Sequence, residues 1–272
     1  MAYKLIAIDL DDTLLDSTLH IPARVRESID KAVDLGIYIV LCTGRILKGS
    51  RRFYDELGLK TAMITTGGAE IYDEDGKCIY SRNVDPAVVR EIIAFAEESG
   101  VHFQVYIGGS LVYRQKNKYL EGYETANGIK GNEMPNLLEL DEIHTPKVLL
   151  ISDPERMDGL QAAARQKFPA LNVNRSKPTY LEFSSPGVSK GDALKFVAQY
   201  YGIQEAETIA IGDAEIDIPM IKAAGLGVAV ANATSITKQA ADYICPTNDE
   251  GGVADVIEKF VLEAQNENQA QN

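Results

Sequence analysis

Apolar runs alternate with stretches of helical periodicity along the first eighty residues. The runs at 4–8, 37–42 and 62–65 are short and almost wholly apolar, which is typical of strands that are buried on both faces. Between them, apolar residues recur at helical spacing over 22–36 and again over 46–57. This β-α-β-α-β order predicts a parallel sheet with right-handed crossovers.

The middle of the chain has a different pattern. Two short strand-like stretches flank Asp75-Gly76, which is a strong hairpin signal. Hairpin and helix patterns are mixed beyond this point, and the alternation of helix and strand returns near the end. We therefore predict an α/β fold in which a doubly wound parallel-sheet core is formed by 1–81 and 188–272, with an inserted α+β cap at 82–187.

Composition and charge narrow the class of protein. The chain has 272 residues, 45% of them hydrophobic and 25% charged, as in globular proteins with a sizeable core. Its formal net charge of -13 argues against nucleic acid or an anionic membrane as a partner. No apolar stretch reaches the roughly eighteen residues of a membrane span, and the apolar run near the start is too short for a signal peptide. Cys42, Cys78 and Cys245 lack metal-site spacing, so we expect reduced cysteines and a cytoplasmic location.

Polar residues follow directly after the predicted buried strands. Asp9 ends the first strand, Thr43-Gly44-Arg45 follows the second, and Asp213 follows a later one. The carboxyl ends of parallel strands meet at one edge of the sheet, where ligands bind near the point at which the strand order reverses. These polar residues are therefore expected to share one cleft.

Four acidic residues are candidates for this cleft, namely Asp9, Asp11, Asp213 and Asp217. Carboxylates that are packed together repel one another unless a cation neutralises them. Neither histidine nor cysteine accompanies these four, and ligation by oxygen alone suits a hard cation such as Mg²⁺. The sequence thus favours a magnesium site.

Positive charge is also available at this edge, because Lys190 opens a predicted helix and Arg45 follows a strand. An acidic cleft with Mg²⁺, hydroxyl groups and a lysine suits a phosphoryl group. Each element has a structural alternative: Asp9 could cap a turn, Lys190 could be a solvated residue at a helix start, and Asp217 could be an N-cap. Their occurrence together and in order favours a phosphoryl-transfer site.

With these motifs the sequence resembles the haloacid dehalogenase superfamily of phosphotransferases, specifically its Cof-type, sugar-phosphatase-like branch. The matching segments are DLDDTLL at 9–15, TGR at 43–45, SKG at 189–191 and GDAEIDIPM at 212–220. The resemblance covers nearly the whole chain. It implies a Rossmann-like core with a large α/β cap between the second and third motifs.

The resemblance implies a role for each matching acidic residue. Asp9 would be the nucleophile that forms an aspartyl-phosphate, and Asp11 would protonate the leaving alcohol and then deprotonate the attacking water. Asp9, the backbone carbonyl of Asp11 and Asp213 would hold Mg²⁺. Asp217 would support the water shell of the metal or Lys190.

Further residues are implied in phosphate and substrate binding. Thr43, Gly44 and Lys190 match the positions that bind the phosphoryl oxygens, and Lys190 thereby joins Asp9 and Asp11 in the catalytic set. The candidates for contact with the rest of the substrate are Arg45, Tyr180 and Glu182. A strand of the cap with one face outward explains Tyr180 and Glu182 equally well.

Three positions depart from the pattern of the relatives. Asp12 stands where Gly is common, Ile216 stands where many relatives have Asn, and the run 66–69 (TGGA) stands where relatives often have Asn-Gly-Ala. Loss of a positioning contact costs on the order of tenfold in rate, because about 1.4 kcal/mol is a factor of ten. These changes leave the catalytic and metal-binding candidates intact.

We expect a Mg²⁺-dependent phosphatase whose partner is a small phosphorylated metabolite, a sugar phosphate or a similar compound. Two alternatives stay open. A phosphomutase of the same architecture would return the phosphoryl group to the sugar. A catalytically weak phosphometabolite-binding protein would bind such a ligand tightly with negligible turnover.

Overall fold

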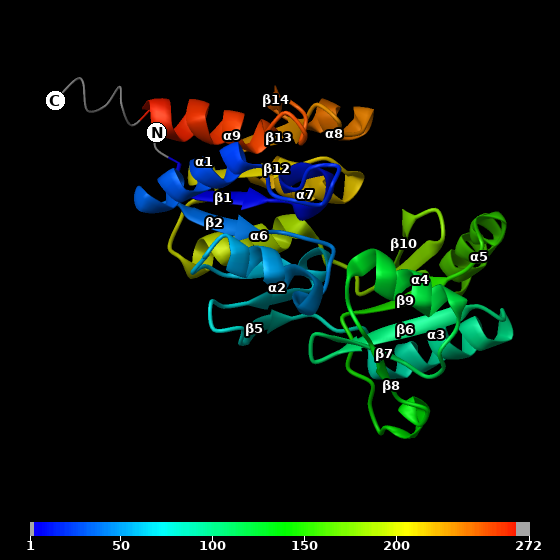
Figure 1. Ribbon diagram of the computed structural model, residues 1–272. Helices are drawn as coiled ribbons and strands as arrows, with labels where there is room; N and C mark the ends of the chain where they lie inside the picture. The colour runs from blue at the N-terminus through cyan, green and yellow to red at the C-terminus, as the bar shows by residue number, and fades with distance from the viewer. Residues whose placement is uncertain (1–2, 265–272) are drawn as a thin grey trace. The chain divides into compact units, whose positions relative to one another are not determined.

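The computed structural model describes residues 3–264 (Figure 1). Contacts among these residues divide the chain into two compact units. Unit 1 comprises 3–44, 52–79 and 189–264, and unit 2 comprises 45–51 and 80–188. The boundaries of core and cap drawn from the sequence stay a prediction, and positions 1–2 and 265–272 of the predicted core lie outside the described residues.

A parallel sheet forms the centre of unit 1. Its strands, in spatial order, are β14 (Tyr243–Cys245), β13 (Leu226–Val230), β12 (Thr208–Gly212), β1 (Leu5–Ile8) and β2 (Tyr38–Leu41). Every neighbouring pair is parallel, and β1 lies between β12 and β2. The predicted α/β fold is thereby confirmed. Because the chain leaves β1 toward β2 and returns on the other side at β12, the strand order reverses at β1.

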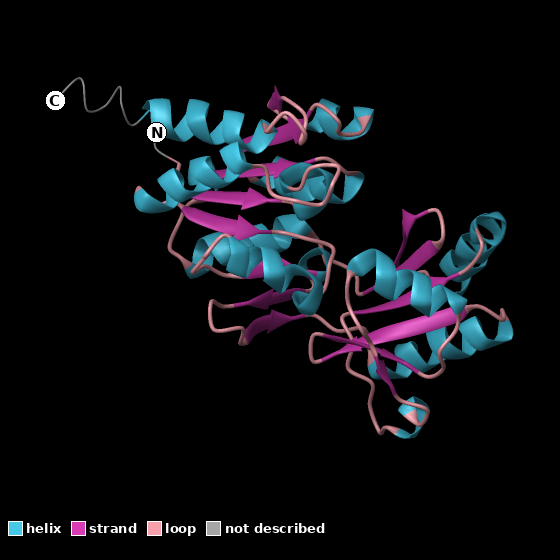
Figure 2. Ribbon diagram, in the orientation of Figure 1, coloured by secondary structure: helices cyan, strands magenta, loops and turns pink. Residues whose placement is uncertain are grey.

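Helices cover this sheet (Figures 1 and 2). They are α1 (Ala23–Asp34), the part of α2 (Leu47–Glu56) from position 52 onward, α6 (Lys190–Tyr200), α7 (Ile218–Ala223), α8 (Ser235–Ala240) and α9 (Gly252–Ile257). Helix α9 continues into a π-helical turn at Glu258–Leu262. Helix α1 packs against α9, and α6 packs against α7. The buried side chains of α1, Val25, Ile29 and Ala32, have the helical spacing seen in the sequence. The sequence pattern did not indicate α8 or β14.

The third apolar run forms β3 (Met63–Thr65), which meets the parallel sheet only through a bridge between Cys42 and Ile64. Its ladder partner is the antiparallel strand β4 (Glu70–Tyr72), and β5 (Cys78–Ser81) completes a three-stranded sheet. The turn between β4 and β5 lies at the predicted hairpin, where Gly76 has a φ of +80°. A residue without a side chain adopts this left-handed conformation without strain.

Unit 2 is built on a six-stranded sheet. Its strands, in spatial order, are β10 (Asn172–Lys177), β11 (Tyr180–Ser184), β9 (Lys147–Ile151), β6 (His102–Ile107), β7 (Ser110–Tyr113) and β8 (Asn132–Glu133). The neighbouring strands are antiparallel except for β7 and β8. Helices α3 (Pro86–Glu98) and α5 (Pro154–Lys167) share one hydrophobic core with the sheet, and α4 (Lys118–Asn127) shares a second.

Helix α4 falls in a polar, weakly patterned stretch of the sequence, 116–142, from which no helix is predicted. The side chain of Asn117 caps the start of the helix by accepting hydrogen bonds from the backbone N–H groups of Tyr119 and Leu120. The helix ends at Gly128, which has a φ of +63°. Its apolar face is interrupted by Glu124, which is buried and accepts hydrogen bonds from Lys130 at 3.0 Å and from the backbone of Gly131 at 2.8 Å. A carboxylate on the buried face removes the hydrophobic period by which a helix is recognised.

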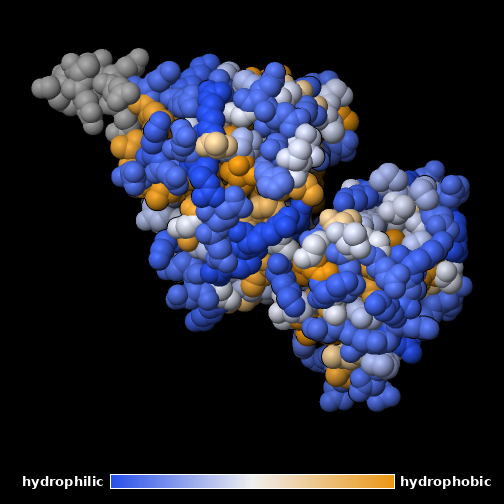
Figure 3. All heavy atoms as spheres, in the orientation of Figure 1, coloured by the Kyte–Doolittle hydropathy of each residue, from blue (hydrophilic) through white to orange (hydrophobic). Residues whose placement is uncertain are grey.

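The surface is mainly hydrophilic on the face that Figure 3 shows, with hydrophobic atoms in small scattered groups. Large apolar side chains that are exposed in unit 1 include Ile216 and Ile244. Among the described residues, no helix has both the length and the apolar character required to cross a membrane.

Candidate active site

Asp9 and Asp213 lie at the same edge of the parallel sheet because each follows one of two paired strands. Strands β1 and β12 are in register at Ile8 and Ile211, and the backbone N–H of Asp9 donates to the carbonyl of Ile211 at 3.0 Å. Both carboxyl groups therefore come from the carboxyl ends of adjacent strands. This is the edge at which the strand order reverses and at which ligands bind in such sheets.

The chain turns sharply after Asp9 in an irregular helical turn, η1 (Leu10–Leu14). Asp12 adopts a φ of +59°, and the Asp12 carbonyl accepts a hydrogen bond from the Asn232 side chain at 2.7 Å. The hydroxyl of Thr13 donates to Oδ1 of Asp213 at 3.1 Å. The turn thus ties the loop after β1 to the loop after β12. Asp11 lies in this turn, partly exposed.

Lys190, the first residue of α6, lies fully inside unit 1 with a side chain that is 1% exposed. Its ammonium group pairs with Oδ1 of Asp217 at 2.5 Å and also with the carboxylate of Asp9. The close approach of α6 to α7 depends on Gly191, because a β-carbon there would lie 2.5 Å from the carbonyl oxygen of Pro219. The packing of these two helices places the ammonium between the two carboxylates.

Asp217 is completely buried, and both of its carboxylate oxygens have partners. Oδ1 accepts from Lys190, while Oδ2 accepts from the backbone N–H groups of Asp213 at 3.1 Å and Ala214 at 3.0 Å. Gly212 makes this possible, since a β-carbon at that position would lie only 2.5 Å from the β-carbon of Asp217. Asp217 therefore fixes both the loop after β12 and the lysine.

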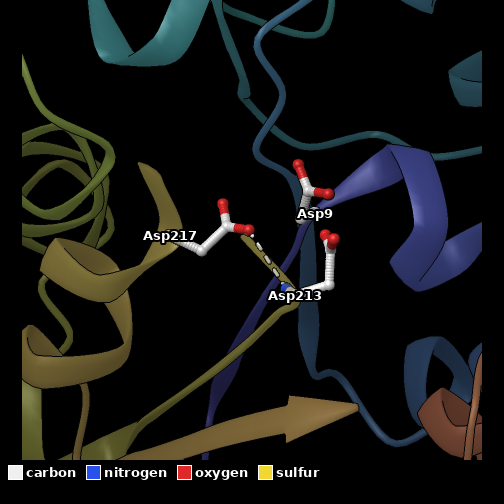
Figure 4. Close-up of side chains that lie close together, drawn as sticks. All are labelled: Asp9, Asp213 and Asp217. Carbon is white, nitrogen blue, oxygen red and sulfur yellow. Dashed lines mark hydrogen bonds between the residues drawn. The ribbon is translucent and has the colours of Figure 1, made fainter. Parts of the chain in front are cut away.

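Asp9, Asp213 and Asp217 each place an oxygen within 4.8 Å of the others. Figure 4 shows the three side chains close together. These three carboxylates and the one ammonium of Lys190 leave two negative charges (3 − 1 = 2), which matches a divalent cation. The donor atoms are all oxygen, as hard cations prefer. Because both oxygens of Asp217 already have partners, Asp9 and Asp213 are the carboxylates best placed to hold a metal directly.

The charges in the site shift the pKa values of its members. Burial, followed by the charges of Asp217 and Asp213, raises the pKa of Asp9 well above its usual range, although Lys190 opposes the shift. Burial and the charge of Asp217 raise the pKa of Asp213 to about 6. Burial alone would lower the pKa of Lys190, but Asp217 and Asp9 outweigh it and raise the pKa. The carboxylates thus repel one another without a cation, while the lysine stays charged.

Thr43 is fully buried at the end of β2, and its carbonyl accepts from the backbone N–H of Gly67 at 3.0 Å. Gly67 belongs to the turn η2 (Thr66–Gly68) that follows β3. At Gly68 a β-carbon would lie 2.3 Å from the carbonyl oxygen of Ser189, so this turn also touches the residue before Lys190. The ends of β2 and β3 and the start of α6 are therefore joined directly.

A family model of haloacid dehalogenase-like hydrolases matches residues 6–257. The chain belongs to this family. The family predicted from the sequence motifs is thus confirmed.

Several relatives of this haloacid dehalogenase-like hydrolase are named phosphatases. The chain is 33% identical over 261 residues to the 5-amino-6-(5-phospho-D-ribitylamino)uracil phosphatase YcsE of Bacillus subtilis, covering 95% of this chain and 96% of that protein. It is 31% identical over 286 residues to the phosphatase YwpJ of the same organism, covering 95% and 100%. The protein is therefore a phosphoric monoester hydrolase of this family.

A solved structure has the same fold. The crystal structure of a haloacid dehalogenase-like hydrolase from Bacteroides thetaiotaomicron superposes with a TM-score of 0.88 at 32% sequence identity, covering 94% of this chain and 99% of that one. The matched part of the chain includes residues of both units.

Three predicted substrate residues of the hydrolase lie in unit 2. Glu182 pairs with Lys147 at 3.0 Å and accepts from the hydroxyl of Ser176 at 2.6 Å. The ring centroid of Tyr180 lies 5.6 Å from that of Tyr123. Arg45 also belongs to this unit, whereas Thr43 and Gly44 belong to unit 1. A role in substrate binding stays a prediction for all three.

Two residues that position the site were not assigned by sequence reasoning. Thr13 orients Asp213 by donating a hydrogen bond to it. The only hint of this role in the sequence is that a hydroxyl residue stands four positions after Asp9 in the first motif. Gly212 has no side chain and so leaves room for Asp217. The sequence hints at this role only by placing a glycine directly before Asp213. Neither role could be read from spacing, because each depends on a partner from a different segment.

Proposed function

We propose that the protein is a Mg²⁺-dependent phosphatase of a small phosphorylated metabolite, such as a sugar phosphate, and that Asp9 forms an aspartyl-phosphate. The observation that carries the proposal is the position of the Lys190 ammonium, which is buried against both Asp9 and Asp217. A buried lysine with an intact charge beside a carboxylate suits the neutralisation of an incoming phosphoryl group. Action in the cytoplasm belongs to the same proposal.

Two successive transfers make up the proposed reaction. The carboxylate of Asp9 attacks phosphorus while the ester oxygen leaves, and Asp11 gives that oxygen its proton. Asp11 then takes a proton from a water molecule, and the hydroxide oxygen attacks the phosphorus of the aspartyl-phosphate. The bond between phosphorus and Asp9 breaks, which releases inorganic phosphate and restores the Asp9 carboxylate. Lys190 and Thr43 hold the phosphoryl oxygens in both steps. The same pair of acidic groups thus splits one difficult hydrolysis into two easier transfers.

Asp9 and Asp213 would hold the metal, with Asp217 keeping their loop in place through its bonds to the backbone of Asp213. When it is bound, Mg²⁺ supplies positive charge that offsets the repulsion of the carboxylates and the charge of the phosphoryl oxygens. The all-oxygen donor set and the excess of two negative charges support this choice of cation.

Unit 2, the predicted cap, would select the leaving group. Arg45, Tyr180 and Glu182 are its candidate contacts to the substrate. The names of the relatives support a small phosphorylated compound as the substrate class, because YcsE acts on a phosphorylated ribitylamino-uracil.

Release of phosphate from p-nitrophenyl phosphate tests the proposal, measured with Mg²⁺, with EDTA and with the variants Asp9→Asn and Asp30→Asn. We expect turnover to require Mg²⁺ and Asp9→Asn to lower kcat by about a thousandfold or more, since the nucleophile is lost. Asp30→Asn is a matched control, because it is the same substitution at an aspartate that is exposed on α1. Full turnover in EDTA, or an Asp9→Asn variant as fast as the wild type, would contradict the mechanism.

A further inference from the structure

Gly67 and Ile216 lie against each other in unit 1. A β-carbon at position 67 would lie 3.4 Å from Cδ1 of Ile216. The two residues come from different loops, since Gly67 follows β3 and Ile216 follows β12. We refer to Gly67 and Ile216 together as the apolar rim, because they belong to loops at the carboxyl ends of β3 and β12.

The loop on one side of the apolar rim has a fixed conformation. Ile216 lies in the turn η5 (Glu215–Asp217), directly before the buried Asp217. The carboxylate of Asp217 accepts from two backbone N–H groups of this loop, and Gly212 packs against the same side chain. Ile216 is nevertheless 49% exposed. A large apolar side chain is therefore presented to solvent by a loop that also carries Asp213.

The turn on the other side is fixed as well. Gly67 has a φ of +67°, and its backbone N–H donates to the carbonyl of Thr43 at 3.0 Å. The next residue, Gly68, approaches the carbonyl of Ser189 so closely that no side chain would fit there. Gly67 of the apolar rim is therefore bonded directly to Thr43, and its neighbour Gly68 packs against Ser189, the residue before Lys190.

The apolar rim offers no side-chain hydrogen bond to anything beside it. Gly67 has no side chain, and Ile216 presents only methyl and methylene groups. A hydroxyl group placed there loses its bonds to water without a replacement, whereas a hydrocarbon loses none and removes apolar surface from water. A single exposed apolar side chain is common on protein surfaces, but this one lies in the turn that ends at Asp217, three residues after Asp213.

We propose that Gly67 and Ile216 determine specificity for the leaving group, and that they favour phosphate monoesters whose carbons next to the phosphate are apolar over those that carry hydroxyl groups there. This inference rests on the proposed phosphatase function and narrows its substrate class. Discrimination by one apolar contact is modest, about tenfold, because a hydrophobic surface rejects a hydroxyl only weakly.

A matched pair of substrates tests the proposal. Propyl phosphate and glycerol 1-phosphate have the same number of carbons and differ by two hydroxyl groups, and the ratio of their kcat/KM values is measured for each variant. We expect Ile216→Asn to lower the ratio of propyl to glycerol ester by about tenfold, mainly through KM, because an amide bonds to hydroxyls. Ile216→Val keeps an apolar group and is expected to retain most of the preference.

Position 67 gives a second, independent variant. Asparagine tolerates a positive φ, so Gly67→Asn places an amide against Ile216 without breaking the turn, and the ratio is expected to fall in the same direction. The control is Ile244→Asn, the same substitution at an isoleucine that is also 49% exposed but lies on β14, at the edge of the sheet. The ratio for this control is expected to match that of the wild type.

The outcomes separate this inference from the function on which it rests. If the wild type releases phosphate in a Mg²⁺-dependent way but Ile216→Asn and Gly67→Asn leave the ratio within twofold, the role of the apolar rim is wrong and the phosphatase proposal stands. If the wild type hydrolyses no monoester at all, both are wrong. A fall in the ratio for both rim variants, with Ile244→Asn unchanged, supports the proposal.

Discussion

The ammonium nitrogen of Lys190 lies 2.5 Å from Oδ1 of Asp217, and neither side chain is more than 1% exposed. Such a pair is costly to bury, because both ions give up their water, and it is retained where its charges have a further use. Here the lysine also pairs with Asp9, so its charge is shared between a residue that orders the loops and the proposed nucleophile.

Removal of this lysine is expected to destabilise unit 1 strongly. Lys190→Met leaves Asp9 and Asp217 buried without their cation, a situation that costs about 3–5 kcal/mol for a buried pair that loses one partner. Urea unfolding at pH 7 in EDTA measures the free energy of unfolding. The double variant Lys190→Met with Asp217→Asn is expected to recover part of the loss, since one unpaired charge is gone. A single variant within 1 kcal/mol of the wild type would show that the pair contributes no net stability.

Thr13 is expected to influence metal binding through Asp213. The hydroxyl of Thr13 helps to lower the pKa of Asp213, against the larger effects of burial and Asp217 that raise it. Thr13→Val removes this hydrogen bond, so the apparent affinity for Mg²⁺ is expected to fall by about tenfold, as for other partners of metal ligands. A titration of phosphatase activity with Mg²⁺ gives the affinity. Thr13→Ser keeps the hydroxyl and serves as the control. Equal Mg²⁺ affinities for the wild type, Thr13→Val and Thr13→Ser would show that this hydrogen bond does not influence metal binding.

Gly212 is expected to tolerate no side chain. A β-carbon there would overlap the β-carbon of Asp217 at 2.5 Å, so Gly212→Ala must displace the loop that carries Asp213. We expect a lower midpoint of thermal unfolding and a large loss of turnover. Gly122 offers the opposite control in α4, because nothing lies within 4 Å of a β-carbon at that position. Gly122→Ala is expected to stabilise by up to about 1 kcal/mol through helix propensity. The same midpoint for the two variants would contradict the steric explanation.

His102 is expected to make the stability of the protein depend on pH. Burial lowers the pKa of His102 below its usual value of 6.5, although a hydrogen bond with Gln104 opposes the shift. The folded state therefore favours the neutral ring, and the stability that this residue contributes is present above pH 6.5 and is lost as the pH falls through the lowered pKa.

Urea unfolding at pH 7.5 and pH 5 checks this expectation in the wild type and two variants. The loss of stability on acidification is expected to be smaller for His102→Gln than for the wild type. His144→Gln is the control, since the His144 side chain is 60% exposed. An acid-induced loss that is the same for His102→Gln as for the wild type would show that another group is responsible.

The sequence determined the strands that carry the chemistry and the residues that follow them. The apolar runs that became β1 and β2 are buried on both faces, so composition alone identifies them, and Asp9 and Thr43 follow them directly along the chain. The motifs also identified the family, whereas the choice of phosphatase over phosphomutase came from the named relatives. Helix α4 was hidden because the buried Glu124 breaks its apolar face, and its charge is satisfied only by residues beyond the helix.

Only the tertiary structure decided how the site is held together. Taken alone in the sequence, Lys190 could have been a solvated residue at a helix start, but the packing of α6 against α7 places it between two carboxylates. The proximity of Gly67 to Ile216 joins two loops that are about 150 residues apart in the sequence, since a β-carbon at position 67 would lie 3.4 Å from Cδ1 of Ile216. Local patterns record propensity and burial, whereas pairing between segments that are far apart in the chain depends on side-chain packing that no local pattern encodes.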